Sequence, residues 1–159
     1  MTAEEAMKEY PKWLNRKKLL EMQIKNLQSI LEIDVIDTMT FSQPNEERVK
    51  SNKISDKTAR TALMYKSLAA KERKEAFKNL NLEYERVCYE IDYFECCVST
   101  LKNYLPGLML DLATKKYKWN EIAKKYSISH AMVGKCRKNA IKELDVFYSE
   151  REKFTVKVD

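Results

Sequence analysis

Apolar residues recur in alternating steps of three and four along one stretch of the chain. They are Phe77, Leu80, Tyr84, Val87, Ile91, Phe94, Val98, Leu101 and Leu105. These steps give a repeat of about 3.5 residues, the period at which α-helices wrap around one another. The pattern predicts a long coiled-coil helix over residues 58–105, and we expect its stripe from Phe77 to Leu101 to be the dimerisation surface.

The opposite side of this predicted helix also carries apolar residues. They follow the same spacing and are Leu82, Tyr89, Tyr93 and Cys96. One partner helix cannot cover both sides, so an N-terminal helix over residues 1–33 could cover one and a second copy of the chain the other. We therefore expect a homodimer. Two alternatives stay open: the N-terminal helix pairs within its own chain or with another, and the two tyrosines are ordinary part-exposed aromatics.

Glycine and proline are scarce in this chain. It has two glycines and three prolines among 159 residues, too few for a loop-rich or all-β protein. A charged fraction of 34% beside a hydrophobic fraction of 44% is typical of a helical chain. The predicted fold class is all-α, with long coiled-coil-forming helices followed by a small C-terminal domain. Residues 34–57 are expected to form a polar linker between the first two helices.

Several classes of protein and site are disfavoured by the sequence. No run of 18 apolar residues occurs and the N-terminus lacks a signal-peptide pattern, so we expect no membrane partner and a cytoplasmic location. The four cysteines, with no CxxC pair and one histidine in the chain, predict reduced thiols and no metal site. Without a glycine-rich phosphate loop or a catalytic triad pattern, we predict a protein that is not an enzyme and needs no cofactor.

Positive charge is concentrated towards the C-terminus. Residues 1–99 balance, so the net charge of +6 lies in residues 100–159. The stretch from Lys115 to Lys142 contains nine positive residues and a single acidic one, Glu121. Such a local excess attracts polyanions, although a solvated basic face is the plainer explanation.

The stretch 106–148 divides into short helical pieces. Pro106 and Gly107 are expected to end the long helix, and helices are predicted over 108–116, over 118–126 and from Ser129 onwards, with Ser129 as N-cap. The expected small core consists of Ile122, Ala123, Ile128, Val133, Ala140, Ile141 and Leu144, with Trp119 and Cys136 also inside. Two helices, a tight turn and a basic second helix are the pattern of a helix-turn-helix.

The stretch "WNEIAKKYSISHAMVGKCRKNAIKEL", Trp119 to Leu144, resembles region 4 of bacterial sigma-70 factors. The resemblance covers about 40 residues, from Leu105 to Leu144, and implies a helix-turn-helix that binds promoter DNA. The layout of the chain is similar to the small ArpU/RinA-type regulators of phage late genes. No stretch resembles the promoter-melting region of a sigma factor, so a complete sigma factor is not expected.

A helical wheel of residues 129–144 separates an apolar face from an outward face. The predicted DNA-binding residues are Ser129, His130, Ala131, Gly134, Lys135, Lys138, Asn139 and Lys142, with Lys115, Lys116 and Lys118 before the helix. Lys135 is the best candidate for a base edge, and the other lysines for phosphates. The resemblance gives His130 a DNA contact; a solvent-facing position is the alternative.

Gly134 costs a helix interior about 1 kcal/mol relative to alanine. Close approach to DNA and close packing on a neighbouring helix would each explain it. Both explanations place the residue at the margin of the outward face.

The predicted function is a sequence-specific DNA-binding transcription regulator of phage or prophage late genes. It would act as a dimer on double-stranded DNA in the bacterial host, at the nucleoid, with the 129–144 helix in the major groove and residues 149–159 as a tail. Two alternatives are a small terminase-type DNA-packaging subunit and a sigma-like module that docks on RNA polymerase or another protein.

Overall fold

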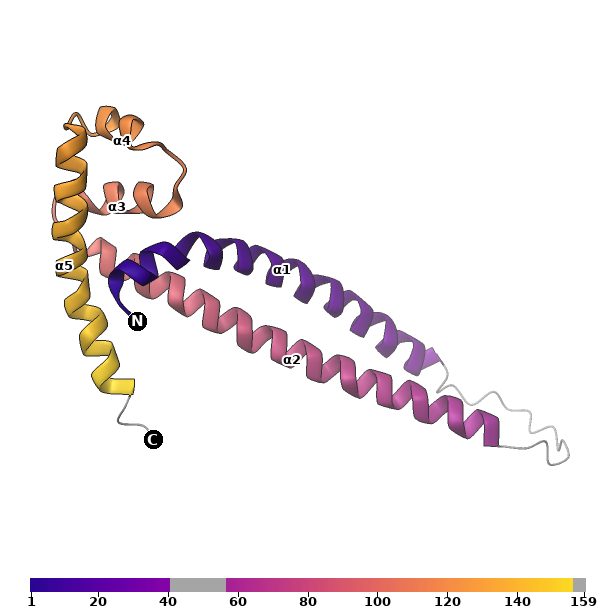
Figure 1. Ribbon diagram of the computed structural model, residues 1–159. Coiled ribbons are helices and arrows are strands. Elements are labelled where there is room, and N and C mark those ends of the chain that lie inside the picture. The colour runs from indigo at the N-terminus through magenta and orange to yellow at the C-terminus, as the bar shows by residue number, and fades with distance from the viewer. Residues whose placement is uncertain (41–56, 156–159) are drawn as a thin grey trace, which may run out of the picture. The chain divides into compact units, whose positions relative to one another are not determined.

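The computed structural model describes residues 1–40 and 57–155, with side chains for 1–33 and 64–153. All regular structure in these residues is helical (Figure 1). The five helices are α1 (Ala3–Thr40), α2 (Lys57–Ser99), α3 (Leu105–Thr114), α4 (Trp119–Lys125) and α5 (His130–Thr155). The predicted all-α class is confirmed. In the described ranges, none of these helices combines the length and the apolar character needed to cross a membrane.

The chain divides into two compact units. Unit 1 combines Met1–Lys17 with Arg86–Asp159, and unit 2 is Lys18–Glu85. Both long helices therefore contribute to both units. Unit 1 contains α3, α4 and α5 and most of the buried side chains, so the candidate site lies there.

Two helices extend further than the sequence predicts. α1 continues to Thr40, so residues 34–40 of the predicted linker are helical, while residues 41–56 lie outside the described part of the chain. α5 runs to Thr155, so most of the predicted tail 149–159 belongs to this helix and only 156–159 lie outside the described residues. Neither extension begins with a proline or glycine that would end a helix.

The end of α2 differs from the prediction. The helix stops at Ser99 and not near residue 105, and Asn103 has a left-handed backbone with φ 57°. The hydroxyl of Ser99 donates to the carbonyl of Cys96 at 2.6 Å, and that of Thr100 to Cys97 at 2.7 Å. Such side-chain hydrogen bonds compete with helical ones, which accounts for the earlier stop.

Pro106 and Gly107 begin α3, so the expectation that they end the long helix is wrong. Pro106 occupies the first turn of α3, where a missing N–H costs nothing. Gly107 does not have a positive φ. A Cβ atom on Gly107 would lie 2.8 Å from the hydroxyl of Tyr126, so this glycine makes room for the Tyr126 side chain.

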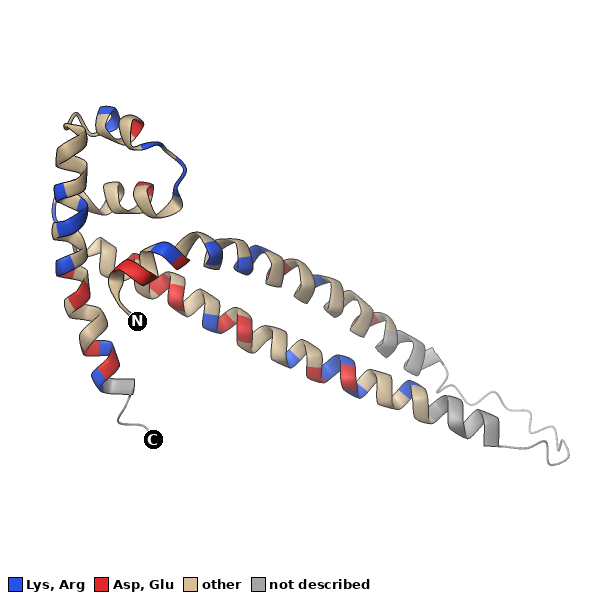
Figure 2. Ribbon diagram, in the orientation of Figure 1, with Lys and Arg blue, Asp and Glu red and all other residues tan. Residues whose placement is uncertain are grey.

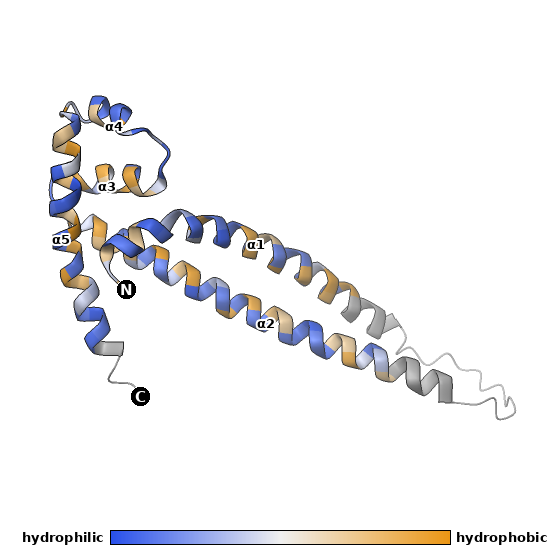
Figure 3. Cartoon of the chain, in the orientation of Figure 1, coloured by the Kyte–Doolittle hydropathy of each residue, from blue (hydrophilic) through white to orange (hydrophobic). Residues whose placement is uncertain are grey.

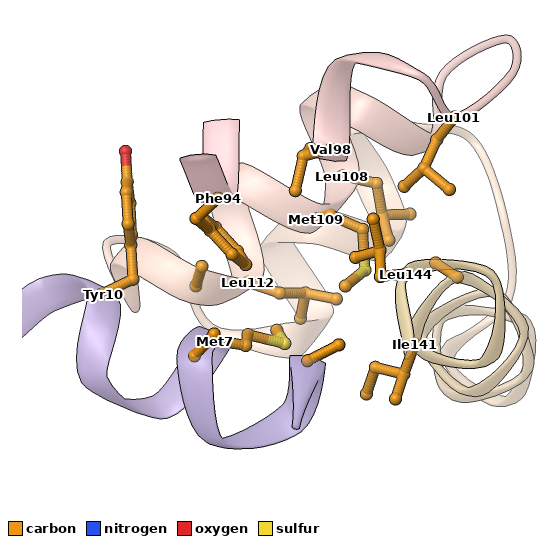
Figure 4. Packing of buried hydrophobic residues seen from close by; sticks show 14 of the residues in the cluster. Met7, Tyr10, Phe94, Val98, Leu101, Leu108, Met109, Leu112, Ile141 and Leu144 are labelled. Atoms are coloured by element: carbon orange, nitrogen blue, oxygen red, sulfur yellow. The ribbon is translucent and has the colours of Figure 1, made fainter. Parts of the chain in front are cut away.

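One core joins all the helices of unit 1 (Figure 4). Its largest fully buried side chains from the helices of this unit are Phe94, Leu108, Met109, Ile122, Leu144, Val98 and Val133. Four residues of the predicted dimerisation stripe, Ile91, Phe94, Val98 and Leu101, belong to this core. Because a buried side chain has no surface left for a second chain, the predicted dimer seam is wrong for this half of the stripe.

The first turns of α1 complete the core of unit 1. Ala3, Ala6 and Met7 are buried there, and the ring of Tyr10 lies 4.8 Å from the ring of Phe94. The hydroxyl of Tyr10 donates to Glu95 at 2.6 Å, and burial, assisted by this hydrogen bond, raises the pKa of Tyr10. In this part of the chain, the N-terminal helix packs within its own chain.

Unit 2 consists of the remaining parts of α1 and α2, on which apolar and polar residues alternate (Figure 3). Leu20 is fully buried, and the hydroxyl of Tyr84 donates to Glu21 at 3.0 Å. The other stripe residues in this unit, Phe77 and Leu80, are half-buried. The hydrogen bond from Tyr84 to Glu21 joins the two helices within the chain.

The opposite side of α2 has two different environments. Leu82 and Tyr89 are 54% and 56% exposed. Tyr93 instead packs on α5: its hydroxyl donates to the carbonyl of Phe147 at 3.0 Å, and its ring lies 5.2 Å from Tyr148. Tyr93, a member of the predicted second stripe, therefore packs against the core of unit 1.

Candidate nucleic-acid interface

A tight turn joins α4 to α5. The N–H of Ile128 donates to the carbonyl of Ala123 at 3.0 Å, and the N–H of Ser127 to Lys124 at 3.2 Å. Ser127 has a left-handed backbone with φ 53°. This is the Schellman arrangement, in which a left-handed residue lets the last helical carbonyls be satisfied. The direction in which α5 leaves α4 is therefore set by the backbone of Ser127.

Replacing Ser127 with glycine is expected to raise the free energy of unfolding by about 0.5–1 kcal/mol, because glycine adopts a positive φ without the steric cost that serine bears. Urea unfolding followed by circular dichroism measures the change. Ser149→Gly, an exposed position inside α5, should lower stability. A Ser127→Gly protein that is less stable than the parent would refute the proposed strain at this turn.

The small core predicted for this region is confirmed. Ile122, Ala123, Val133, Ala140, Ile141 and Leu144 are buried, Ile128 packs against them, and Cys136 is also inside. The N–H of Met132 donates to Oγ of Ser129 at 3.2 Å, as expected of an N-cap. Trp119, however, is 40% exposed, so its placement in the core is wrong. Its ring lies 5.3 Å from that of His130 at the start of α5.

The predicted outward face of α5 is exposed in the structure. Every predicted contact residue on this helix is exposed except Gly134, which is half-buried: Ser129, His130, Ala131, Lys135, Lys138, Asn139 and Lys142. Positive residues gather along this part of α5 and on the loop between α3 and α4 (Figure 2). The inward face, centred on Val133, Ala140 and Leu144, packs on the rest of unit 1.

The lysines of this face differ from neighbouring cations in having no acidic partner. Within the described residues, Lys135, Lys138 and Lys142 form no ion pair. By contrast, Lys125 donates to Asp111 at 2.6 Å and Arg137 to Glu4 at 2.9 Å. The hydrogen bond to Asp111 raises the pKa of Lys125. On this face of α5, these three lysines are thus available to an external anion.

The loop between α3 and α4 carries Lys115, Lys116 and Lys118, all exposed. Lys115 caps α3 in a left-handed conformation with φ 54°. The backbone N–H of Lys118 donates to Oε2 of Glu121 at 2.7 Å, so Glu121, the acidic residue of this stretch, helps to start α4. The side-chain ammonium groups of the three lysines take no part in this hydrogen bond.

Two exposed cations of this region, Lys124 and Lys125, were not assigned from the sequence, and Lys125 is paired with Asp111. Lys124 on α4 has no acidic partner in the described part of the chain. Its place among the nine positive residues was the available signal, but the wheel of α5 alone could not show the exposure of α4.

Gly134 does not owe its presence to tight packing. A Cβ atom at this position would meet Cζ3 of Trp119 at 3.7 Å, which is ordinary van der Waals contact. Close packing on a neighbouring helix, one of the two explanations for a glycine at position 134, is therefore not supported by this distance.

Among the residues that the structure describes, no three His, Cys, Asp or Glu side chains gather in a way that could hold a metal ion. Comparisons of the chain with known protein families, with curated proteins and with solved structures find no match.

Proposed function

We propose that the chain is a DNA-binding transcription regulator in which α4 and α5 form a helix-turn-helix and α5 enters the major groove. The observation that carries the proposal is the exposed face of α5. Lys135, Lys138 and Lys142 lie there without acidic partners among the described residues, on the side of the helix opposite its buried residues. Cations with this freedom are the groups that neutralise DNA phosphates.

The first two turns of α5 suit close approach to a groove. Ala131 and Gly134 have small or absent side chains, and Lys135 follows directly. The major groove is about 12 Å wide and admits one α-helix, whose N-terminal residues reach base edges. We assign Lys135 to a base edge, preferably guanine, and Lys138 and Lys142 to phosphates.

The turn supports the same proposal. A helix-turn-helix joins its two helices by three or four residues that often include glycine. Here Ser127, with φ 53°, supplies the left-handed conformation that glycine usually provides. The resemblance of Trp119–Leu144 to sigma-70 region 4, and of the layout to ArpU/RinA-type phage late regulators, favours the promoters of phage or prophage genes as targets.

Unit 2 is the place we propose for self-association, since half of the predicted seam is buried in unit 1. Large apolar side chains of both its helices are exposed: Leu19, Met22, Ile30 and Ile33 on α1, and Met64, Tyr65, Leu68 and Leu82 on α2. Exposed apolar surface of this extent on a chain is typical of a protein–protein interface. A dimer would present two α5 helices to a repeated or palindromic site.

A charge placed on the exposed side of α2 tests the dimer. Leu68→Lys with Leu82→Lys is expected to convert a dimer into a monomer in sedimentation equilibrium, because two desolvated charges would oppose association. Ala76→Lys, at an exposed position off this stripe, should stay dimeric. A parent protein that is monomeric would contradict the dimer, and a larger ring would favour the packaging alternative.

Salt dependence tests the proposed DNA contact. Fluorescence anisotropy with labelled duplex DNA should show log K falling linearly with log salt concentration, with a slope of about −0.9 for each phosphate contact. No binding at low salt, or an affinity that does not change with salt concentration, would contradict the proposal.

Substituting alanine for Gly134 separates stability from DNA affinity. We expect stability to stay level or to rise by about 0.5–1 kcal/mol, because alanine is the better helix former and has room beside Trp119. DNA affinity should fall by roughly fivefold, since the added methyl group stands between the helix and the groove. Urea unfolding and anisotropy measure the two effects, and Ser149→Ala, at an exposed position of α5 outside the predicted DNA-binding residues, provides the control. Lower stability with unchanged affinity would restore the packing explanation.

A further inference from the structure

A pocket of about 420 Å³ opens on unit 1, away from the residues proposed to read bases. It lies between the first turns of α1, the end of α3, the loop that follows and the inner flank of α5. Its volume falls within the range of small-molecule sites in proteins.

Three cations line this pocket: Lys8, Lys115 and Arg137. A single carboxylate, Glu4, serves two of them, with 3.4 Å to Lys8 and 2.9 Å to Arg137. The hydrogen bond from Arg137, with a further contribution from Lys8, lowers the pKa of Glu4. Lys115 has no acidic partner among the described residues. The lining of the pocket therefore carries an excess of positive charge, which suits an anion.

The remaining walls are apolar and aromatic. Tyr117 and Trp119 line the pocket and are 38% and 40% exposed, and the buried residues Met7 and Leu112 line it as well. Inorganic phosphate would leave these walls uncovered. A ligand with a planar ring attached to its anionic group would use both the cations and the rings.

We propose that this pocket binds a nucleoside monophosphate, with the phosphate at Lys8, Lys115 and Arg137 and the base against Tyr117 and Trp119. The consequence for DNA binding rests on the proposed function. Trp119 also lies against the first turns of α5: its ring is 5.3 Å from that of His130, and its edge faces Gly134. A nucleotide that moves this ring would alter the part of α5 that approaches DNA.

Trp119 supplies the reporter for the test. In a Trp13→Phe background it is the remaining tryptophan of the chain. Its fluorescence is followed during titration with adenosine 5′-monophosphate, guanosine 5′-monophosphate and inorganic phosphate. We expect saturable binding of at least one nucleotide, about tenfold tighter than that of phosphate. No saturable change with either nucleotide, or equal affinity for phosphate alone, would overturn the proposal.

Three variants test which side chains bind the phosphate group of the nucleotide. Lys115→Asn removes a cation but keeps a residue that tolerates the left-handed conformation, and should weaken nucleotide binding about tenfold. Lys124→Asn, an exposed lysine of α4 outside the pocket lining, is the control and should leave nucleotide binding unchanged. Glu4→Gln releases Lys8 and Arg137 and should strengthen binding. Equal effects of the two lysine variants, or weaker binding by the Glu4 variant, would refute the site.

The DNA proposal and the nucleotide proposal can fail separately. Nucleotide binding is read from Trp119 fluorescence without DNA, and DNA binding from anisotropy without nucleotide. A chain that binds nucleotide but not DNA would overturn the function proposed above and leave this site intact.

Discussion

Replacing Phe94 with alanine is expected to lower the free energy of unfolding by about 3–5 kcal/mol, the largest effect of any single substitution considered for this chain. The Phe94 side chain has no exposed surface and lies against the ring of Tyr10. Its removal would leave a cavity where the first turns of α1 meet the end of α2. Since a domain of this size is stable by only about 5–15 kcal/mol, much of the protein would be unfolded in moderate urea.

Phe147→Ala is the matched control for this experiment. Phe147 is the same residue type on α5 and is 36% exposed, and its backbone carbonyl, which accepts the hydrogen bond from Tyr93, is retained in the variant. We expect it to cost less than about 1 kcal/mol. Chemical unfolding curves with equal m-values give both differences. Similar costs for the two substitutions would contradict the burial of Phe94 in an intramolecular core.

The second large effect is expected from neutralising the outward face of α5. The triple variant Lys135→Gln, Lys138→Gln and Lys142→Gln should bind duplex DNA about 10²–10⁴-fold more weakly, since each lost contact costs roughly 1–2 kcal/mol. The slope of log K against log salt should become shallower by about 2–3. Because the three side chains are exposed and unpaired within the described residues, folding should be unaffected.

A control with the same change in net charge separates a local contact from general attraction. Lys18, Lys25 and Lys78 are exposed lysines of unit 2. Changing these three to glutamine should alter DNA affinity by less than about threefold, the small effect expected of exposed charges that are screened by salt and do not contact DNA. Equal losses in the two triple variants would mean that DNA responds to total charge and not to α5.

The sequence predicted the helices better than their ends. Hydrophobic periodicity determines which face of a helix is buried, and the small core around Ile122, Val133 and Leu144 followed from it directly. The end of α2 at Ser99 did not follow from the periodicity, because it depends on two hydroxyl-to-carbonyl hydrogen bonds and on the left-handed backbone of Asn103. Proline at 106 looked like a terminator, although proline also fits the first turn of a helix.

The apolar stripe on α2 shows what a periodic pattern cannot decide. The spacing from Phe77 to Leu101 predicts a buried seam, and its second half is buried. It does not say what covers that seam. In unit 1 the cover comes from Ala3, Met7 and Tyr10 of the same chain and from α3 and α5. Contacts between residues more than 80 positions apart, such as Tyr10 with Phe94, have no local signature.

The parts of the candidate site that depend on one helix could be predicted from the sequence. The parts that depend on contacts between helices could not. The outward face of α5 follows from a wheel of its own residues. The exposure of Trp119 and the pairing of Arg137 with Glu4 depend on neighbouring helices and emerged only from the structure. The same is true of the pocket beside them.

The most direct test of α5 as the DNA-reading helix is the specificity of Lys135→Ala. Sites enriched by the parent protein from random-sequence DNA would be compared with scrambled sites by anisotropy at one salt concentration. We expect the parent to prefer its enriched site by about 10³-fold or more. Lys135→Ala should lose about 1–3 kcal/mol of that preference while binding scrambled DNA nearly as well. An unchanged preference in Lys135→Ala, or a parent protein that enriches no site, would contradict the assignment.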